Sequence, residues 1–452
     1  MTKIEGFPGF YQSFSRLAAV NIVSNLMVPL AGLVDVAFLG HLSEIRHLAG
    51  VAIATVLFNY IYWTFGFLRM GTTGTVAQAV GRGDRDAVVI TGLRNGLLAV
   101  ALGLAILVLQ YPLRELGFRL LSATPEVKAA GLAYYNAMVW GAVPTLTNFV
   151  LIGWFLGQSK GGQVLLLSAI ANAANIGLNY IFIVRWGWES AGAGWGTALS
   201  QYAMLAVGLI LLYRDVRWSK QQGGQERLEW RQQWRQWRTA LWNRAALIAT
   251  FSLSSDIVIR TFALVTTFAL FTNLSSALGT TVLAANTLLL QVITFSAYFI
   301  DGVAFATESF SGLFRGRGLT RELVVLLKLA GAASLAFGVS FAVLIIAVPT
   351  PLFSILTSHT DVIQHVRPLV GWLLPVLGFG SIAYMLDGYF LGLTEGKILR
   401  TSSLLASLVG FAPMAIASYI WQSEQLLWLA LTCFMAARAI TLSSQIPKTL
   451  RT

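Results

Sequence analysis

Apolar residues form long runs along this chain, and polar residues are confined to short stretches between them. Runs such as 129–159 and 163–184 contain no charged residue and are long enough to cross the ~30 Å hydrocarbon layer of a bilayer as a helix. We therefore predict an all-α integral membrane protein with twelve transmembrane helices. The predicted spans are roughly 14–39, 48–72, 88–110, 130–156, 163–184, 191–213, 245–270, 281–306, 322–347, 368–391, 402–421 and 424–445.

A nine-residue motif occurs twice, as GWFLGQSKG at 153–161 and as GYFLGLTEG at 388–396, 235 residues later. Other short matches, such as 81–83 and 316–318, keep the same offset. The chain is therefore predicted to contain two copies of a six-span unit. Because six is even, both copies enter and leave on the same side of the membrane, which makes them a parallel repeat. The predicted domains are 1–213, a linker at 214–244, and 245–452.

The composition agrees with a membrane protein, since 56% of the residues are hydrophobic and only 11% are charged. The net charge of +12 would suggest a nucleic-acid partner in a soluble protein, but in a membrane protein the basic residues are interpreted by side. With the N-terminus inside, the inner segments hold twenty-two Lys and Arg residues and the outer loops hold six. We therefore expect a multi-pass protein of the cell inner membrane with both termini cytoplasmic and no nucleic-acid partner.

The linker contains a pattern typical of an interfacial amphipathic helix. In LEWRQQWRQWRTALW, Trp230, Trp234, Trp237 and Leu241 follow helical spacing, and arginines occupy the other faces. Indole rings favour the headgroup zone, and arginines favour anionic lipid. This pattern predicts a helix that lies on anionic lipid at the inner surface.

Asp35 is the acidic residue in the first span, within VPLAGLVDVAFLGHL. Charged side chains inside a span cost several kcal/mol on lenient scales, so they usually have a function. Desolvation favours the neutral form of a carboxyl group, which predicts a proton-coupling role for Asp35. Pro29, six residues earlier, lacks an amide hydrogen and predicts a helix break that couples protonation to helix shape.

Uncharged polar residues cluster in the fifth and sixth spans. Asn175 and Asn179 share related faces of the fifth span, and Thr197 lies early in the sixth. These groups are candidate partners for a coupling residue, although amides in membrane helices also bond neighbouring helices for purely structural reasons.

The second half carries more charged groups inside its spans. Asp256 and Arg260 are one helical turn apart and could form an ion pair on one face. Asp301 and Glu308 are two turns apart on the eighth span, and Asp387 lies near the inner end of the tenth. All five are candidate substrate or coupling residues.

Arg69 lies in the second span of the first half at a depth similar to those acids. Buried charges need partners, so we consider Arg69 a candidate gate that bridges to Glu308 or Asp301, with a static pair within one half as the alternative.

No constellation of catalytic residues is present in the sequence. The four histidines fall in predicted outer loops or at span edges, and there is no Walker sequence and no dinucleotide fingerprint. We expect neither an enzyme nor a bound metal or cofactor.

The chain resembles the multidrug and toxic compound extrusion (MATE) family, and more narrowly its DNA-damage-inducible F (DinF) branch. The resemblance rests on the twelve spans, the repeat, and the stretches VPLAGLVDVAFLGHL, FLRMGTTGTVAQAVGRGD, GWFLGQSKG, FIDGVAFATESFSG and LDGYFLGLTEG. It implies a V-shaped pair of six-helix bundles and secondary antiport from the cytoplasm outward. It also implies that the acid matching Asp35 takes the coupling ion, with polar partners at Asn175 and Thr197.

Two positions depart from the pattern of the family. Members commonly have an aspartate where this chain has Asn179, and a proline where it has Val20. Without the second carboxylate a sodium site is less attractive, since hard cations prefer charged oxygen ligands. We therefore expect H⁺ as the coupling ion and Na⁺ as the less favoured choice.

Taken together, these features predict a monomeric antiporter that exports amphipathic, cationic organic compounds in exchange for protons. Three alternatives stay open: an exporter of organic anions such as carboxylates or phenolic acids, a lipid-linked precursor flippase, and a membrane receptor or scaffold.

Overall fold

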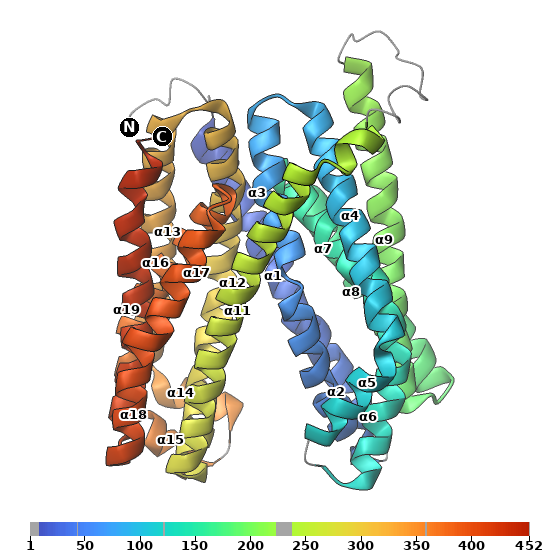
Figure 1. Cartoon of the computed structure of the whole chain (residues 1–452). Helices are drawn as coiled ribbons and strands as arrows, with labels where there is room; N and C mark the ends of the chain where they lie inside the picture. Colours follow the sequence, from blue (N-terminus) through green and yellow to red (C-terminus); the bar gives the residue numbers. More distant parts are fainter. Residues whose placement is uncertain (1–8, 43, 121–122, 223–236, 358, 452) are drawn as a thin grey trace. The chain divides into compact units, whose positions relative to one another are not determined.

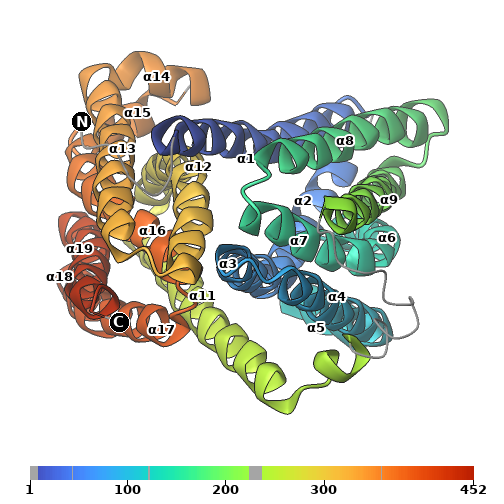
Figure 2. The same ribbon diagram turned by 90° about the horizontal axis from the view of Figure 1, so that it is seen from above.

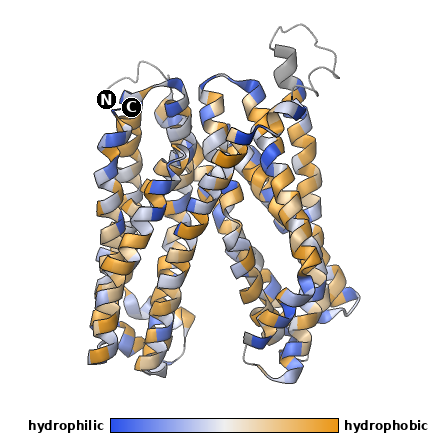
Figure 3. Ribbon diagram, viewed as in Figure 1, coloured by the Kyte–Doolittle hydropathy of each residue, from blue (hydrophilic) through white to orange (hydrophobic). Residues whose placement is uncertain are grey.

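The computed structural model describes residues 9–42, 44–120, 123–222, 237–357 and 359–451. These residues form helices and connecting turns without any β-strand, and twelve helical stretches are long and apolar enough to cross a membrane. Apolar residues dominate these stretches along their length (Figure 3). The predicted all-α fold with twelve spans is confirmed.

The first six spans are built from the helices of residues 10–222. They are α1 (Phe10–Gly40), α2 (Ile45–Thr64) with α3 (Phe67–Gly81), α4 (Arg85–Val108), α6 (Pro125–Met138) with η1 (Val139–Gly141) and α7 (Ala142–Gly157), α8 (Gly161–Asn179) with η2 (Tyr180–Arg185), and α9 (Glu189–Gln222); the short α5 (Gln110–Leu120) connects α4 to α6.

The last six spans follow the same order (Figure 1). They are α11 (Arg244–Leu278), α12 (Thr280–Arg317), α13 (Thr320–Ala347), η3 (Val370–Trp372) with α16 (Leu373–Gly392), α17 (Gly396–Leu405) with η4 (Ala406–Phe411) and α18 (Ala412–Trp421), and α19 (Glu424–Thr449); α14 (Pro349–Leu356) and α15 (Thr360–Val366) connect α13 to η3.

By packing, the chain divides into two compact units. The N-unit is Val23–Ala249, and the C-unit is the described part of Met1–Ile22 together with Thr250–Thr452. The first turns of α1 belong to the C-unit, where Phe10 packs edge-on against Phe310 with ring centroids 5.3 Å apart. Within each unit the helices run alongside one another as a bundle (Figure 2). The domain boundaries at 213 and 244, which follow the sequence repeat, stay a prediction.

The repeated nonapeptide is explained by how its glycines pack. A Cβ atom on Gly153 of α7 would lie 2.4 Å from the carbonyl oxygen of Arg69 in α3, and one on Gly388 of α16 would lie 2.3 Å from the carbonyl oxygen of Ala304 in α12. Any larger residue would push the helices apart. Both members of each pair are 235 residues apart, so the two copies preserve the same backbone contact between their second and fourth spans.

Equivalent spans in the two halves also contain the same irregularity. The fifth span ends in the π-helix η2, and the eleventh contains the π-helix η4 in its middle. Such widened turns leave backbone groups without their regular partners and often occur at functional sites. Both π-helices lie beside features described below.

Candidate functional site

Asp35 lies in α1 and is joined to the fifth and sixth spans by hydrogen bonds. The Nδ2 group of Asn179 donates to Oδ1 of Asp35 and also to Oδ1 of Asn175, the latter at 3.3 Å. Nδ2 of Asn175 in turn donates to Oγ1 of Thr197 at 3.2 Å. The four residues predicted as the coupling group and its polar partners thus form one connected chain of hydrogen bonds, which we call the Asp35 cluster.

The backbone around the cluster fixes the position of Asn179. This residue ends the regular part of α8, directly before η2, and its side chain is fully buried. The Oδ1 atom of Asn179 lies so close to Gly196 of α9 that a Cβ atom there would be only 1.9 Å away. The absence of a side chain at Gly196 is therefore what gives Asn179 room to reach Asp35.

The groups around Asp35 are uncharged. Asn175, Asn179 and Thr197 are amides and a hydroxyl, and Tyr134 of α6, which interacts electrostatically with Asp35, is a phenol that is neutral at neutral pH. The Oδ1 atom of Asn179 is buried and has no hydrogen-bond partner. A carboxyl group in such surroundings can hold a proton and donate it to that free oxygen.

Pro29 behaves differently from the sequence prediction. The structure has α1 as one helix from Phe10 to Gly40 that continues through Pro29, whereas the sequence pattern predicted a helix break there. A membrane helix tolerates proline when neighbouring groups satisfy the freed carbonyl oxygen. The coupling of protonation to a break at Pro29 therefore has no support in α1.

Charged groups of the C-unit form two buried pairings. Asp256 of α11 accepts a hydrogen bond from Nη1 of Arg400 at 2.7 Å. Asp387 of α16 accepts from both Arg260 of α11 and Arg438 of α19, each through the same oxygen, Oδ2. The same-face pair of Asp256 with Arg260, considered from the sequence, is replaced by these contacts between helices.

Arg438 is the site residue that sequence reasoning missed. Its side chain is fully buried, its guanidinium lies 5.4 Å from the ring centroid of Tyr384, and Nε and Nη1 have no hydrogen-bond partner. The only signal in the sequence was a basic residue inside the apolar twelfth span. With Arg260 it places two positive charges on the single carboxylate of Asp387.

The remaining charged candidates lie in α3 and α12. Glu308 is fully buried and Asp301 is partly buried, both on α12 of the C-unit. Arg69 lies in α3 of the N-unit. Each of the three makes further interactions, and the gate between Arg69 and these acids stays a prediction.

Two glutamate–histidine pairs occupy corresponding places in the two units. Glu189 and Glu424, 235 residues apart, stand in the first turn of α9 and α19, the last span of each half. Oε2 of Glu189 lies 3.1 Å from Nε2 of His47, and Oε2 of Glu424 lies 2.7 Å from Nε2 of His365. Each pair ties the start of the last span to another segment of its own unit.

The linker is described only from Trp237 onward, so Trp230 and Trp234 lie outside the described residues. Trp237 and Leu241 are buried, and the indole nitrogen of Trp237 donates to Asp86 at 3.2 Å. Arg94 of α4 donates to the carbonyl oxygen of Ala240 at 2.8 Å. In this part of the linker, the predicted apolar face contacts the N-unit rather than the lipid headgroups.

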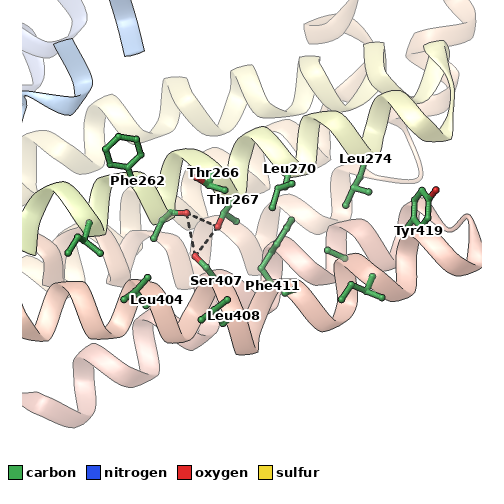
Figure 4. A pocket seen from close by; sticks show the side chains of 15 residues that line it. Phe262, Thr266, Thr267, Leu270, Leu274, Leu404, Ser407, Leu408, Phe411 and Tyr419 are labelled. Carbon is green, nitrogen blue, oxygen red and sulfur yellow. Dashed lines mark hydrogen bonds between the residues drawn. The ribbon is translucent and has the colours of Figure 1, made fainter. Parts of the chain in front are cut away.

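A long groove runs along the C-unit between α11 and the eleventh span (Figure 4). It has a volume of about 590 Å³ and extends from Ile259 to Leu274 on α11 and from Leu404 to Tyr419 on the eleventh span. We call it the α11–η4 groove. Among the described residues, no group of three or more His, Cys, Asp or Glu side chains could hold a metal ion.

Comparison with known proteins agrees with this architecture. The MatE family model matches residues 21–181 and 257–441. DNA damage-inducible protein F of Escherichia coli is 31% identical over 95% of this chain and 90% of its own length. A probable multidrug resistance protein NorM of Thermotoga maritima is 22% identical over 80% of this chain and 75% of its own.

The fold is also that of a solved transporter structure. An outward-facing multidrug resistance MATE family transporter of the MOP superfamily aligns with a TM-score of 0.84 and 18% identity, over 97% of this chain and 96% of that one. This chain is a multi-pass membrane protein that belongs to the MATE family. Within that family it is a DinF-like member.

Proposed function

We propose that this protein exports amphipathic, cationic organic compounds from the cytoplasm in exchange for protons, and that Asp35 takes and releases the proton. It works in the cell inner membrane with both termini cytoplasmic and needs no cofactor. The relatives named for multidrug resistance support export of organic compounds. The observation that carries the proton coupling is the neutral surrounding of Asp35.

The Asp35 cluster suits a proton because it offers a hydrogen bond to either form of the carboxyl group. The carboxylate accepts from Nδ2 of Asn179. The protonated form has an O–H donor, and Oδ1 of Asn179 is a buried acceptor with no other partner. Neither state of Asp35 therefore leaves a buried polar group of this pair unsatisfied, which keeps the proton exchange from costing several kcal/mol.

The same cluster is a poor match for sodium. Hard cations prefer several oxygen ligands with negative charge, and Asp35 is the only carboxylate in the cluster. One proton that moves down one pH unit supplies about 1.4 kcal/mol, which supports roughly tenfold accumulation of one monovalent cation.

The test is transport into proteoliposomes under an imposed pH gradient, followed with a fluorescent lipophilic cation such as ethidium. We expect Asp35→Asn to abolish movement driven by the gradient. Asp361→Asn, which removes an exposed carboxylate in α15 of the C-unit, serves as the control and should leave transport unchanged. Wild-type rates for Asp35→Asn would contradict the proposal, and so would transport driven by a sodium gradient at constant pH.

One observation favours the alternative of organic-anion export. In the C-unit Asp387 is neutralised by Arg260 and Arg438, so the trio carries an excess positive charge. A cationic substrate gains nothing from such a site, whereas a carboxylate does. The same liposomes loaded with a phenolic acid distinguish the two substrate classes.

A further inference from the structure

The α11–η4 groove has an apolar body. Its rim consists of exposed apolar side chains, among them Phe262, Leu408 and Ile416, which are 55%, 67% and 60% exposed. Its floor includes Phe411, which is almost fully buried. An exposed and continuous apolar surface of this kind commonly marks a binding site.

The polar atoms on the floor of the groove are already satisfied. Oγ1 of Thr267 lies 3.0 Å from Oγ of Ser407, and both hydroxyls reach the carbonyl oxygen of Ala263 (Figure 4). An apolar ligand can therefore cover them without leaving a buried donor or acceptor unpaired. The floor accepts a hydrocarbon chain and offers little to a polar one.

The shape of the groove suits a single extended chain. It spans fifteen residue steps along α11, which corresponds to about 22 Å of helix. The contacts Asp256 with Arg400 and Thr267 with Ser407 follow one another in the same sense on both walls, so the two helices run in parallel. The length is most of the ~30 Å hydrocarbon layer, and the groove lies along the direction of the spans.

One end of the groove is cationic. Arg400 lies one helical turn before Leu404, and Lys397 lies almost one turn before Arg400, so all three share a face of α17. Of the pair at this end, the side chain of Asp256 is only 5% exposed whereas that of Arg400 is 37% exposed. The group that faces outward is thus the guanidinium, with the carboxylate buried behind it and Glu395 five residues away, outside the i+3 and i+4 positions that share its face.

We propose that the α11–η4 groove binds an anionic phospholipid, with one acyl chain in the groove and the phosphate on Arg400 and Lys397. Arg400 uses Nη1 for Asp256 and keeps further N–H donors in the planar arrangement that matches phosphate. Basic residues were counted as inner at this end of the spans, so the lipid belongs to the cytoplasmic leaflet, where anionic headgroups are abundant. The bound phosphate shares Arg400 with Asp256 and so connects lipid composition to the charge network of the C-unit.

The π-helix gives the groove its shape. Ser407, Leu408 and Phe411 all belong to η4, and Gly410 lets this wider turn pack closely on α19, where a Cβ atom would lie 2.9 Å from the carbonyl oxygen of Cys433. The irregular turn thus has a role in the ligand site.

The experiment compares lipid binding to the delipidated full-length protein by native mass spectrometry. Phosphatidylglycerol and phosphatidylcholine with identical acyl chains are titrated separately. We expect phosphatidylglycerol to bind at least about tenfold more tightly, because a hydrogen bond to a charged group contributes on the order of one such factor or more. Arg400→Gln should remove most of this preference, and Arg321→Gln, an exposed basic residue in the first turn of α13, should keep it.

A second pair of variants tests the groove itself. Ala412→Phe fills the groove and should weaken binding of both lipids, whereas Ala336→Phe on the exposed face of α13 should have no effect. Equal binding of the two lipids would overturn the proposal, as would a preference that survives Arg400→Gln. Displacement of the lipid by a transported cation would also overturn it, because the groove would then be a substrate site.

Discussion

The side-chain amide of Asn179 donates a hydrogen bond to the carboxylate of Asp35, across 144 positions of sequence. The bond joins the first and fifth spans within the N-unit. It also places the acid in a cluster of amides and a hydroxyl, with no basic residue among its hydrogen-bond partners. Two predictions follow from the geometry of this one contact.

The first concerns Gly196, which leaves room for Asn179. A Cβ atom at this position would lie 1.9 Å from Oδ1 of Asn179, so Gly196→Ala must displace the amide from Asp35. We expect proton-driven transport to fall at least about tenfold, as for loss of a hydrogen bond to a charged group. Gly177→Ala in α8 is the matched control, because nothing lies within 4 Å of the added atom there. Equal loss in both variants would show that the effect is a general one on helix packing.

The second concerns the charge of the cluster. Asn179→Asp adds a carboxylate beside Asp35 and provides the charged oxygen ligands that a hard cation prefers. We expect this variant to respond to a sodium gradient at constant pH, measured as sodium-dependent efflux of the same fluorescent cation from liposomes. Asn172→Asp, on the same helix but bonded to the carbonyl oxygen of Ser168, should stay insensitive to sodium. A sodium response in both variants would contradict the assignment.

The third prediction concerns the charge balance around Asp387. Asp387→Asn leaves two buried arginines without a carboxylate, which typically costs about 3–5 kcal/mol of unfolding free energy. Arg438→Met leaves Arg260 and Asp387 as a one-to-one pair and should cost less, despite removing a larger charged side chain. Thermal unfolding in detergent checks the order of the two. A larger loss for Arg438→Met would mean that the excess positive charge is balanced by another group.

The fourth concerns the described end of the linker. Arg94 donates from Nη2 to Ala240 and from Nε to Leu241, whose carbonyl oxygens lie at the end of a short helical turn. Arg94→Gln should release this segment and increase tryptic cleavage at Arg238 or Arg244 several-fold. Arg82→Gln, an exposed basic residue between α3 and α4, should leave the cleavage rate unchanged. Resistance of Arg94→Gln to trypsin would show that Trp237 alone holds the segment.

Much of the fold was predictable because the spans are local features. An apolar run announces its own helix, and the predicted span 245–270 differs from the observed α11 mainly at its outer end. The repeated glycines were visible as a motif as well. Their reason was not, since it depends on the carbonyl oxygens of Arg69 and Ala304 in other helices.

The site was predictable only in part, because partners in different helices leave no periodic signal. The acids Asp256 and Asp387 stood out as costly charges, yet their partners Arg400 and Arg438 are 144 and 51 positions away. The one pairing that spacing did suggest, Asp256 with Arg260, was replaced by these distant contacts. Similarly, the helical spacing of Trp237 and Leu241 indicated an apolar face without indicating what covers it.

The glutamates that begin the last span of each half show how the two copies have diverged. The acid stands at the same register in both, but its imidazole partner comes from the second span in one copy and from a connecting helix in the other. Selection has thus kept a demand for a bond and let the supplier change. An alignment of the two halves would record a conserved glutamate and an unconserved histidine, and would hide that both bundles fasten the same corner.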